Sequence, residues 1–249
     1  MADISFIHLA SANKSVATSN IIKNVRKYHP NAYYFLASDG IDDLSEIAKT
    51  YNCDYKFYEN RLGYLAQYNG YGYPPEKIVE WLSRLLYACQ NCNTSHILMM
   101  EDDVWLLNSV TVEDSWEMAC HTPTPGDNII PEFVIDIAQQ FSGVRAKTNQ
   151  FGAGGGSIFK VSTFIENYDK IKEFILSKGE DIRSNYPPMG SLDVFMVVYY
   201  FLCGKEYTTN PHLIDAHSHK PGFDYEEFVG NLAPEIQIVN NYKKWYWNE

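Results

Sequence analysis

Cysteine is scarce in this sequence, and its scarcity limits the compartments in which the protein can work. Five Cys among 249 residues, an odd number in so long a chain, do not form the disulfide framework of a small secreted domain. The first residues, Met1-Ala2-Asp3, lead into a strand-like run and not into a basic region followed by the apolar core of a signal peptide. We therefore expect a reduced protein in the cytoplasm.

Basic residues and long hydrophobic runs are also in short supply. Lys and Arg number 20 and Asp and Glu number 31, which gives a formal net charge of −11. A protein this acidic repels phosphate backbones, so we expect no nucleic-acid partner. The longest apolar stretch, residues 194–203, is too short to cross a bilayer, and we expect no membrane span. Apolar and aromatic residues, at 45% and 15%, suffice for a folded core and for stacking on sugars or bases.

Strand-like and helix-like segments alternate through the first half of the chain. Short apolar runs typical of buried strands are separated by segments with helical spacing of apolar residues. This alternation predicts an α/β fold with a mostly parallel, Rossmann-type central sheet and helices on both faces, in which ligands bind beyond the carboxyl ends of the strands. The expected strands are residues 4–9, 33–36, 55–58 and 96–100, and the expected helices are residues 15–28, a short helix capped by Asp42 or Asp43 and ending at Tyr51, and residues 75–89.

The second half is less regular. We expect a strand at residues 132–137, a glycine-rich turn running into a strand at 151–160, and helices at 163–177 and 192–202. No clear linker divides the chain. We therefore expect one domain over residues 1–249, with a nucleotide-binding half at 1–105 and an acceptor-binding half at 106–249.

Three consecutive carboxylates, Glu101-Asp102-Asp103, follow the expected strand at residues 96–100. A strand period of two would put Glu101 and Asp103 on one face, with Asp102 on the other. Adjacent negative charges repel one another unless solvent, hydrogen-bond donors or a cation compensates them. A hard divalent cation that bridges to a diphosphate would do so. The alternative is a solvated acidic turn.

A second group of polar residues lies late in the chain, in the segment from Asp215 to Gly222. If this segment is extended, Asp215, His217 and His219 share one face and could contribute to a metal shell. Lys220 could contact a phosphate as a point charge. The alternative is a surface loop before Pro221 in which the histidines only meet solvent.

Glycines and two isolated acids complete the set of candidates. The run Gly152 to Gly156 lets a backbone approach a flat ligand closely, although a structural bulge is an equal reading. Asp39 ends the second expected strand, where a carboxylate could accept hydrogen bonds from a ribose or a base. Asp193 lies in the first turn of an expected helix, where it could serve as a base or simply complement the helix dipole.

Taken in chain order, these features resemble the nucleotide-sugar glycosyltransferases of the GT-A fold. Glu101 to Asp103 stand where that family has its Asp-x-Asp motif, with Glu in place of the first Asp, and the late His-Lys-Pro lies at 219–221. The resemblance implies that Asp103 binds Mn²⁺ or Mg²⁺ and that Glu101 reaches ribose or metal. It further implies that a late His or Lys completes the metal shell or the diphosphate contact. The compact size is similar to that of enzymes from large DNA viruses or bacteria, which would place a viral protein in the host cytoplasm.

The function that follows is a Mn²⁺- or Mg²⁺-dependent hexosyl- or pentosyltransferase, with a UDP- or GDP-sugar as donor and a carbohydrate hydroxyl as acceptor. The alternatives are a sugar-nucleotide pyrophosphorylase and a catalytically degenerate carbohydrate-binding module. Asp193 is the candidate catalytic base if the reaction inverts the anomeric configuration. The other assignments are metal binding by Glu101, Asp103, His217 and His219, donor binding by Ala10, Ser11, Asp39, Arg84, Glu101, Asp102 and Lys220, and acceptor binding by Gly154, Gly155, Gly156 and Trp105.

Overall fold

The computed structural model describes residues 4–10, 14–40, 43–59, 62, 73–121, 129–146, 149, 154–186, 202, 204–205, 208–216 and 223–244. In chain order its elements are β1 (Ile4–Leu9), α1 (Ser15–Tyr28), β2 (Tyr34–Asp39), α2 (Ser45–Thr50), β3 (Asp54–Tyr58), α4 (Pro75–Asn91), β4 (His96–Met100), β5 (Trp105–Leu106), β6 (Met118–Cys120), α5 (Glu132–Ser142), β7 (Ile158–Lys160), α6 (Val161–Asn185), β8 (Thr208–Thr209), β9 (Leu213–Asp215), α8 (Tyr225–Gly230) and β10 (Ile238–Asn240).

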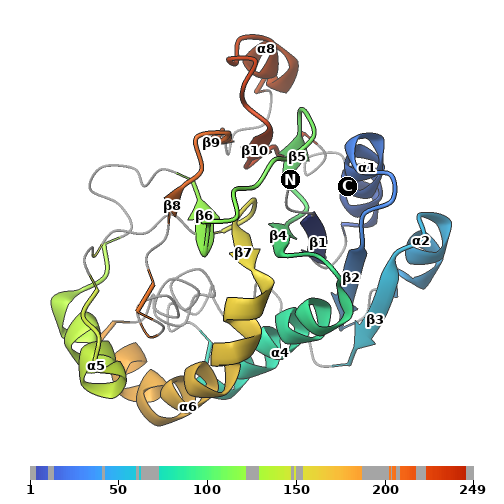
Figure 1. Cartoon of the computed structure of the whole chain (residues 1–249). Helices are drawn as coiled ribbons and strands as arrows, with labels where there is room; N and C mark the ends of the chain where they lie inside the picture. The colour runs from blue at the N-terminus through green and yellow to red at the C-terminus, as the bar shows by residue number, and fades with distance from the viewer. Residues whose placement is uncertain are drawn as a thin grey trace.

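A seven-stranded sheet with the order β3-β2-β1-β4-β7-β6-β8 forms the centre of the molecule (Figure 1). The strands β3, β2, β1 and β4 are mutually parallel, and β6 pairs with β8 in parallel, whereas β7 runs antiparallel to both β4 and β6. A smaller sheet with the order β5-β10-β9 lies beside it. The expected α/β fold with a mostly parallel sheet is therefore confirmed.

Helices cover both faces of the large sheet. Alternate residues of β4 show the division, because Ile97 and Met99 join the core under α4, α5 and α6, while Leu98 and Met100 join the core under α1 and α2. All four side chains are buried. This two-sided burial explains why β4 reads as a continuous apolar run and not as an alternating one.

The strand expected at residues 132–137 is wrong, because these residues belong to α5. Pro131 precedes the helix with a φ of −60°, and Gly143 follows it in the left-handed conformation with a φ of +76°. The buried residues Val134, Ile135 and Ala138 are spaced as on one side of a helix. A short apolar run fits a strand or a helix equally well, and here the flanking Pro and Gly mark the ends of a helix.

The remaining elements of the second half agree in part with expectation. The strand expected within residues 151–160 is β7, and the helix expected at 163–177 is α6, which is longer at both ends. The helix expected at residues 192–202 lies outside the described residues except for Leu202. Among the helices that the structure describes, none combines the length and the apolar composition needed to cross a membrane.

Candidate functional site

The acidic triplet forms a tight turn at the end of β4. The backbone N–H of Val104 donates a hydrogen bond to the carbonyl oxygen of Glu101 at 3.1 Å, so strand alternation does not continue through the triplet. The three carboxylates nevertheless differ in their surroundings. Asp102 is fully buried, Asp103 is 6% exposed, and Glu101 is half-buried.

The Asp102 side chain is buried and fixes the turn through hydrogen bonds with the protein interior. Its Oδ1 accepts a hydrogen bond from Thr18 Oγ1 at 2.9 Å and lies 2.8 Å from Nε2 of His8. The other ring nitrogen of His8 lies 2.7 Å from the hydroxyl of Tyr34. All four side chains are buried, so this network ties the turn to β1, β2 and α1.

Asp103 is a buried carboxylate with an incomplete set of partners. Its Oδ2 lies 3.7 Å from Nζ of Lys243, and its Oδ1 has no hydrogen-bond partner among the described residues. Burial raises the pKa of Asp103 to about 6; Lys243 opposes this shift, and the charges of Asp102 and Asp215 reinforce it. The ionised form of Asp103 is therefore costly in this place until a further cation or donor arrives.

Gly155 leaves a small space between two further oxygen atoms. A β-carbon on Gly155 would lie 2.8 Å from Oδ1 of Asn240, 3.1 Å from Oε2 of Glu101 and 2.6 Å from a methyl carbon of Val104. Asn240 is the last residue of β10, and its Oδ1 is buried without a hydrogen-bond partner among the described residues. Two oxygens thus flank a space that only glycine keeps open.

A backbone hydrogen bond joins the turn after β4 to the segment after β10, which places Asp103 next to the end of β10. The backbone N–H of Tyr242, two residues beyond β10, donates to the carbonyl oxygen of Asp103 at 2.7 Å. We call Glu101, Asp103 and Asn240 the strand-end oxygen site. A further acid, Asp215, ends β9 in register with Asn240 and accepts a hydrogen bond from the side-chain amide of Asn241 at 2.7 Å.

The strand-end oxygen site fits a hard divalent cation. Carboxylate and amide oxygens are the donors that Mg²⁺ and Mn²⁺ prefer, and two of these oxygens are buried with no partner that the structure describes. No three His, Cys, Asp or Glu side chains in the described part of the chain are grouped closely enough to bind a metal. A cation bound by the described residues would therefore need the amide oxygen of Asn240 as a ligand in addition to the carboxylates of Glu101 and Asp103.

Asp39 and Arg84, both assigned to donor binding from the sequence, lie together at the end of β2. The Oδ2 of Asp39 accepts hydrogen bonds from a guanidinium nitrogen of Arg84 at 2.8 Å and from the backbone N–H of Leu62 at 2.9 Å. The guanidinium lies 4.2 Å from the ring centre of Tyr58. Because Arg84 is 2% exposed, this is a buried ion pair that fastens α4 and Leu62 to the carboxyl end of the sheet.

The remaining sequence assignments divide into those that the structure describes and those that lie outside the described residues. Ala10 follows β1 and donates its backbone N–H to the carbonyl oxygen of Ala37 at 2.9 Å. Trp105 opens β5 and stacks on Tyr242, with ring centres 5.1 Å apart. Gly154 to Gly156 lie directly before β7, and Gly156 donates to the carbonyl oxygen of Met99 at 2.8 Å. The assignments that lie outside the described residues are Ser11, Asp193, His217, His219 and Lys220.

Sequence reasoning did not single out Asn240 or Lys243. The run Ile236-Gln237-Ile238-Val239-Asn240 carries a signal that could have found the first, because it is a strand-like run that ends in a polar residue, as does the run before Glu101. Lys243 carries no such signal, because its place beside Asp103 depends on the contact between the ends of β10 and β4.

Comparison with solved structures shows what the whole chain is similar to. A galactosyltransferase, LgtC, solved in complex with donor and acceptor sugar analogues, superposes with a TM-score of 0.53 over 95% of this chain and 86% of that chain, at 14% sequence identity. No family model and no curated protein matches the sequence. The likeness confirms the GT-A-like fold that the sequence predicts.

Proposed function

We propose that the protein is a divalent-cation-dependent glycosyltransferase that moves a hexosyl or pentosyl group from a UDP- or GDP-sugar to a hydroxyl group of a carbohydrate. The observation that carries the proposal is a pair of buried oxygens without described partners: Oδ1 of Asp103, beyond the carboxyl end of β4 in a GT-A-like sheet, and Oδ1 of Asn240, at the end of β10 in the small sheet beside it. Ligands bind beyond that edge in this architecture. The complex of LgtC with donor and acceptor sugar analogues supports the same classes of ligand.

The strand-end oxygen site would hold Mn²⁺ or Mg²⁺. A diphosphate beside Glu101 and Asp103 would otherwise meet charges of its own sign, and the cation would neutralise the charge that develops on the diphosphate as the anomeric bond breaks. Lys243 supplies a positive charge 3.7 Å from Asp103. His217 and His219 are proposed to complete the shell of the cation, and Lys220 is proposed to contact the diphosphate.

The nucleoside and the acceptor are proposed to bind on either side of this centre. Asp39, fixed by Arg84, lies at the end of the strand next to β1 and is proposed to border the nucleoside together with Ala10 and Ser11. The backbone of residues 154–156 is proposed to face the acceptor, because glycines allow close approach. Asp193 is proposed as the base that takes the proton of the acceptor hydroxyl if the reaction inverts.

A cytoplasmic location belongs to the same proposal. The four described cysteines, at positions 53, 89, 92 and 120, are thiols without disulfide bonds. Burial raises the pKa of the Cys53 thiol to about 11, so this sulfur is protonated at neutral pH and reacts slowly with oxidants. A chain of this kind suits a reducing compartment.

The test measures donor binding with and without the cation. Thermal unfolding of the wild type is followed with UDP- and GDP-sugars in Mn²⁺ or in EDTA, because a ligand that binds only the native state raises its stability, by about 2.7 kcal/mol at 100 times the dissociation constant. We expect stabilisation by one sugar nucleotide in Mn²⁺ only. Asp103→Asn should abolish it, whereas Asp114→Asn, which changes an exposed acid elsewhere, should not. Equal donor binding in EDTA would contradict the proposal.

A further inference from the structure

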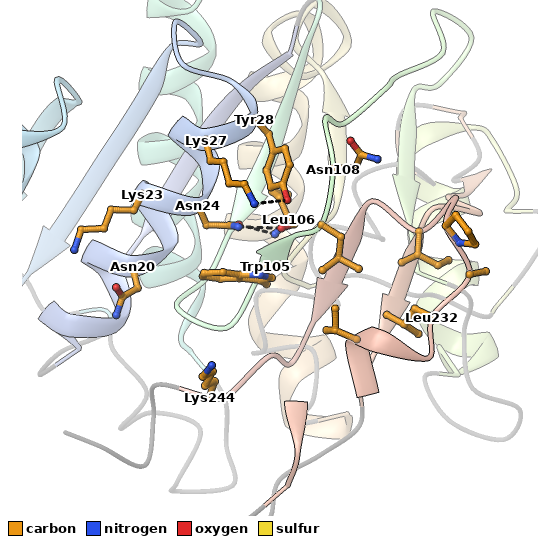
Figure 2. Close-up of a pocket in the computed structure, with 15 residues that line it drawn as sticks. Asn20, Lys23, Asn24, Lys27, Tyr28, Trp105, Leu106, Asn108, Leu232 and Lys244 are labelled. Carbon is orange, nitrogen blue, oxygen red and sulfur yellow. Dashed lines mark hydrogen bonds between the residues drawn. The ribbon is translucent and has the colours of Figure 1, made fainter. Parts of the chain in front are cut away.

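A cavity of about 790 Å³ lies between α1, the start of β5 and the segment that follows α8 (Figure 2). Asn20, Lys23, Asn24 and Lys27 line it from α1, and Trp105 and Lys244 line it from the small sheet and its C-terminal continuation. None of the residues of the strand-end oxygen site lines it. We call this space the α1–β5 cavity.

The charge of the α1–β5 cavity is opposite to that of the chain. Three lysines line it and no Asp or Glu does, in a protein whose net charge is −11. Lys27 donates a hydrogen bond to the hydroxyl of Tyr28 at 3.0 Å, and Nζ of Lys23 lies 6.0 Å from the centre of the Tyr51 ring. Lys244 pairs with Glu226, but Glu226 is largely exposed, so an anion can replace it at little cost.

The spacing of the lysines indicates an extended anion. Lys23 and Lys27 are four residues apart on one face of α1, about 6 Å along the helix axis, which is comparable to the length of one sugar unit in a glycan. Lys244 reaches the cavity from a different element. Lysines on two separate elements suit an anion whose charges are repeated along a chain.

The uncharged part of the lining suits sugar rings. Trp105 is half-buried and is held by its stacking on Tyr242 with an interplanar angle of 18°. A fixed indole ring offers apolar surface to the C–H face of a pyranose at small entropic cost. Asn20 and Asn108 supply amides for hydroxyl groups, and the opposite wall is apolar, formed by Val229, Leu232, Ala233, Pro234 and Ile236.

We infer that the α1–β5 cavity binds an acidic oligosaccharide, with carboxylate groups at Lys23, Lys27 and Lys244 and a sugar ring at Trp105. In the proposed transferase this glycan would be the acceptor chain, and only that part of the inference rests on the proposed function. Binding itself depends on neither donor nor divalent cation, because the cavity shares no lining residue with the strand-end oxygen site.

The test uses calorimetry in EDTA, without donor, so that its outcome is independent of transfer. The probe is tetragalacturonic acid, and maltotetraose is the neutral control. We expect the acidic tetrasaccharide to bind more tightly, and Lys23→Gln/Lys27→Gln to weaken it by about tenfold. Lys49→Gln/Lys172→Gln, which removes the same charge from exposed sites on α2 and α6, should bind it as the wild type does.

A second variant tests the aromatic contact. Trp105→Phe keeps a ring against Tyr242 but offers a smaller face, so we expect weaker binding of the acidic tetrasaccharide by a variant that remains folded. The inference is overturned if the acidic tetrasaccharide does not bind at millimolar concentration, if both double lysine variants lose affinity equally, or if UDP with Mn²⁺ displaces it. Failure here would leave the donor-binding test of the transferase untouched.

Discussion

Asp103→Asn should stabilise the protein in the absence of metal. Burial raises the pKa of Asp103 from its usual 3.8 to about 6, and each unit corresponds to about 1.36 kcal/mol. Ionised Asp103 therefore costs the native state about 3 kcal/mol. The Asn side chain has the same shape and no charge, but its NH₂ group leaves a hydrogen bond unmade at a cost of about 1 kcal/mol. We expect a net gain of about 2 kcal/mol at pH 8.

The gain in unfolding free energy of Asp103→Asn over the wild type should increase as the pH rises. Because the native pKa of Asp103 is above its unfolded value, the native state binds the proton more tightly, and the wild type loses stability as the pH rises from about 4 to about 6. Asp103→Asn lacks this loss. The difference between variant and wild type should therefore be small or reversed near pH 4 and reach its full size above pH 6.

Urea unfolding in EDTA at several pH values measures this difference, and Asp102→Asn is the matched control. That change weakens the hydrogen bonds with Thr18 and His8 in a fully buried place, so it should destabilise the protein by about 2 kcal/mol. A destabilised Asp103→Asn, or a gain that is the same at pH 4.5 and pH 8, would refute the reasoning from the buried charge.

Two further changes test the framework of the site. Arg84→Ala should cost about 3–5 kcal/mol in urea unfolding, because it leaves Asp39 buried without its ion-pair partner, and a loss below 1 kcal/mol would contradict a buried pair. Gly155→Ala should cost about 1–3 kcal/mol and weaken Mn²⁺ binding, because its β-carbon would meet Asn240 at 2.8 Å. Gly230→Ala, where a β-carbon has no neighbour within 4 Å, is the control. Equal losses in both variants would argue against the oxygen-flanked space at Gly155.

Local patterns in the sequence were sufficient for the first half of the fold. The strands at residues 4–9 and 96–100 and the helix at 15–28 are marked by short apolar runs and by helical spacing, and the structure has each of them with those bounds. The strand expected at residues 132–137 is wrong because six residues with mixed periodicity fit a strand or a helix equally well, and the structure has α5 there. The short strands β5 and β9 give too few residues for a pattern, and the pairing of both with β10 depends on contacts distant in sequence.

The residues of the candidate site also divide into those that a local sequence signal marks and those that only long-range contacts bring together. Glu101 to Asp103 stand out because three acids directly follow a buried run, and that signal is local. The pairing of Asp39 with Arg84 spans 45 positions, and the approach of Asn240 to Glu101 requires the ends of β4 and β10 to meet. Such contacts follow from the topology of the sheet and not from spacing along the chain, so residue type alone could not establish them.

The antiparallel pairing of β7 with β4 also sets the order in which the sheet can be completed during synthesis. The parallel strands β1 to β4 leave the ribosome first, while residues 158–160, which pair with one side of β4, follow only after β5, β6 and α5. Until then β4 has an open edge of unpaired backbone groups and an apolar sequence, a combination that favours association with other chains. The three acids that follow β4 place like charges beside this edge, and neighbouring nascent chains that carry the same acids repel one another there.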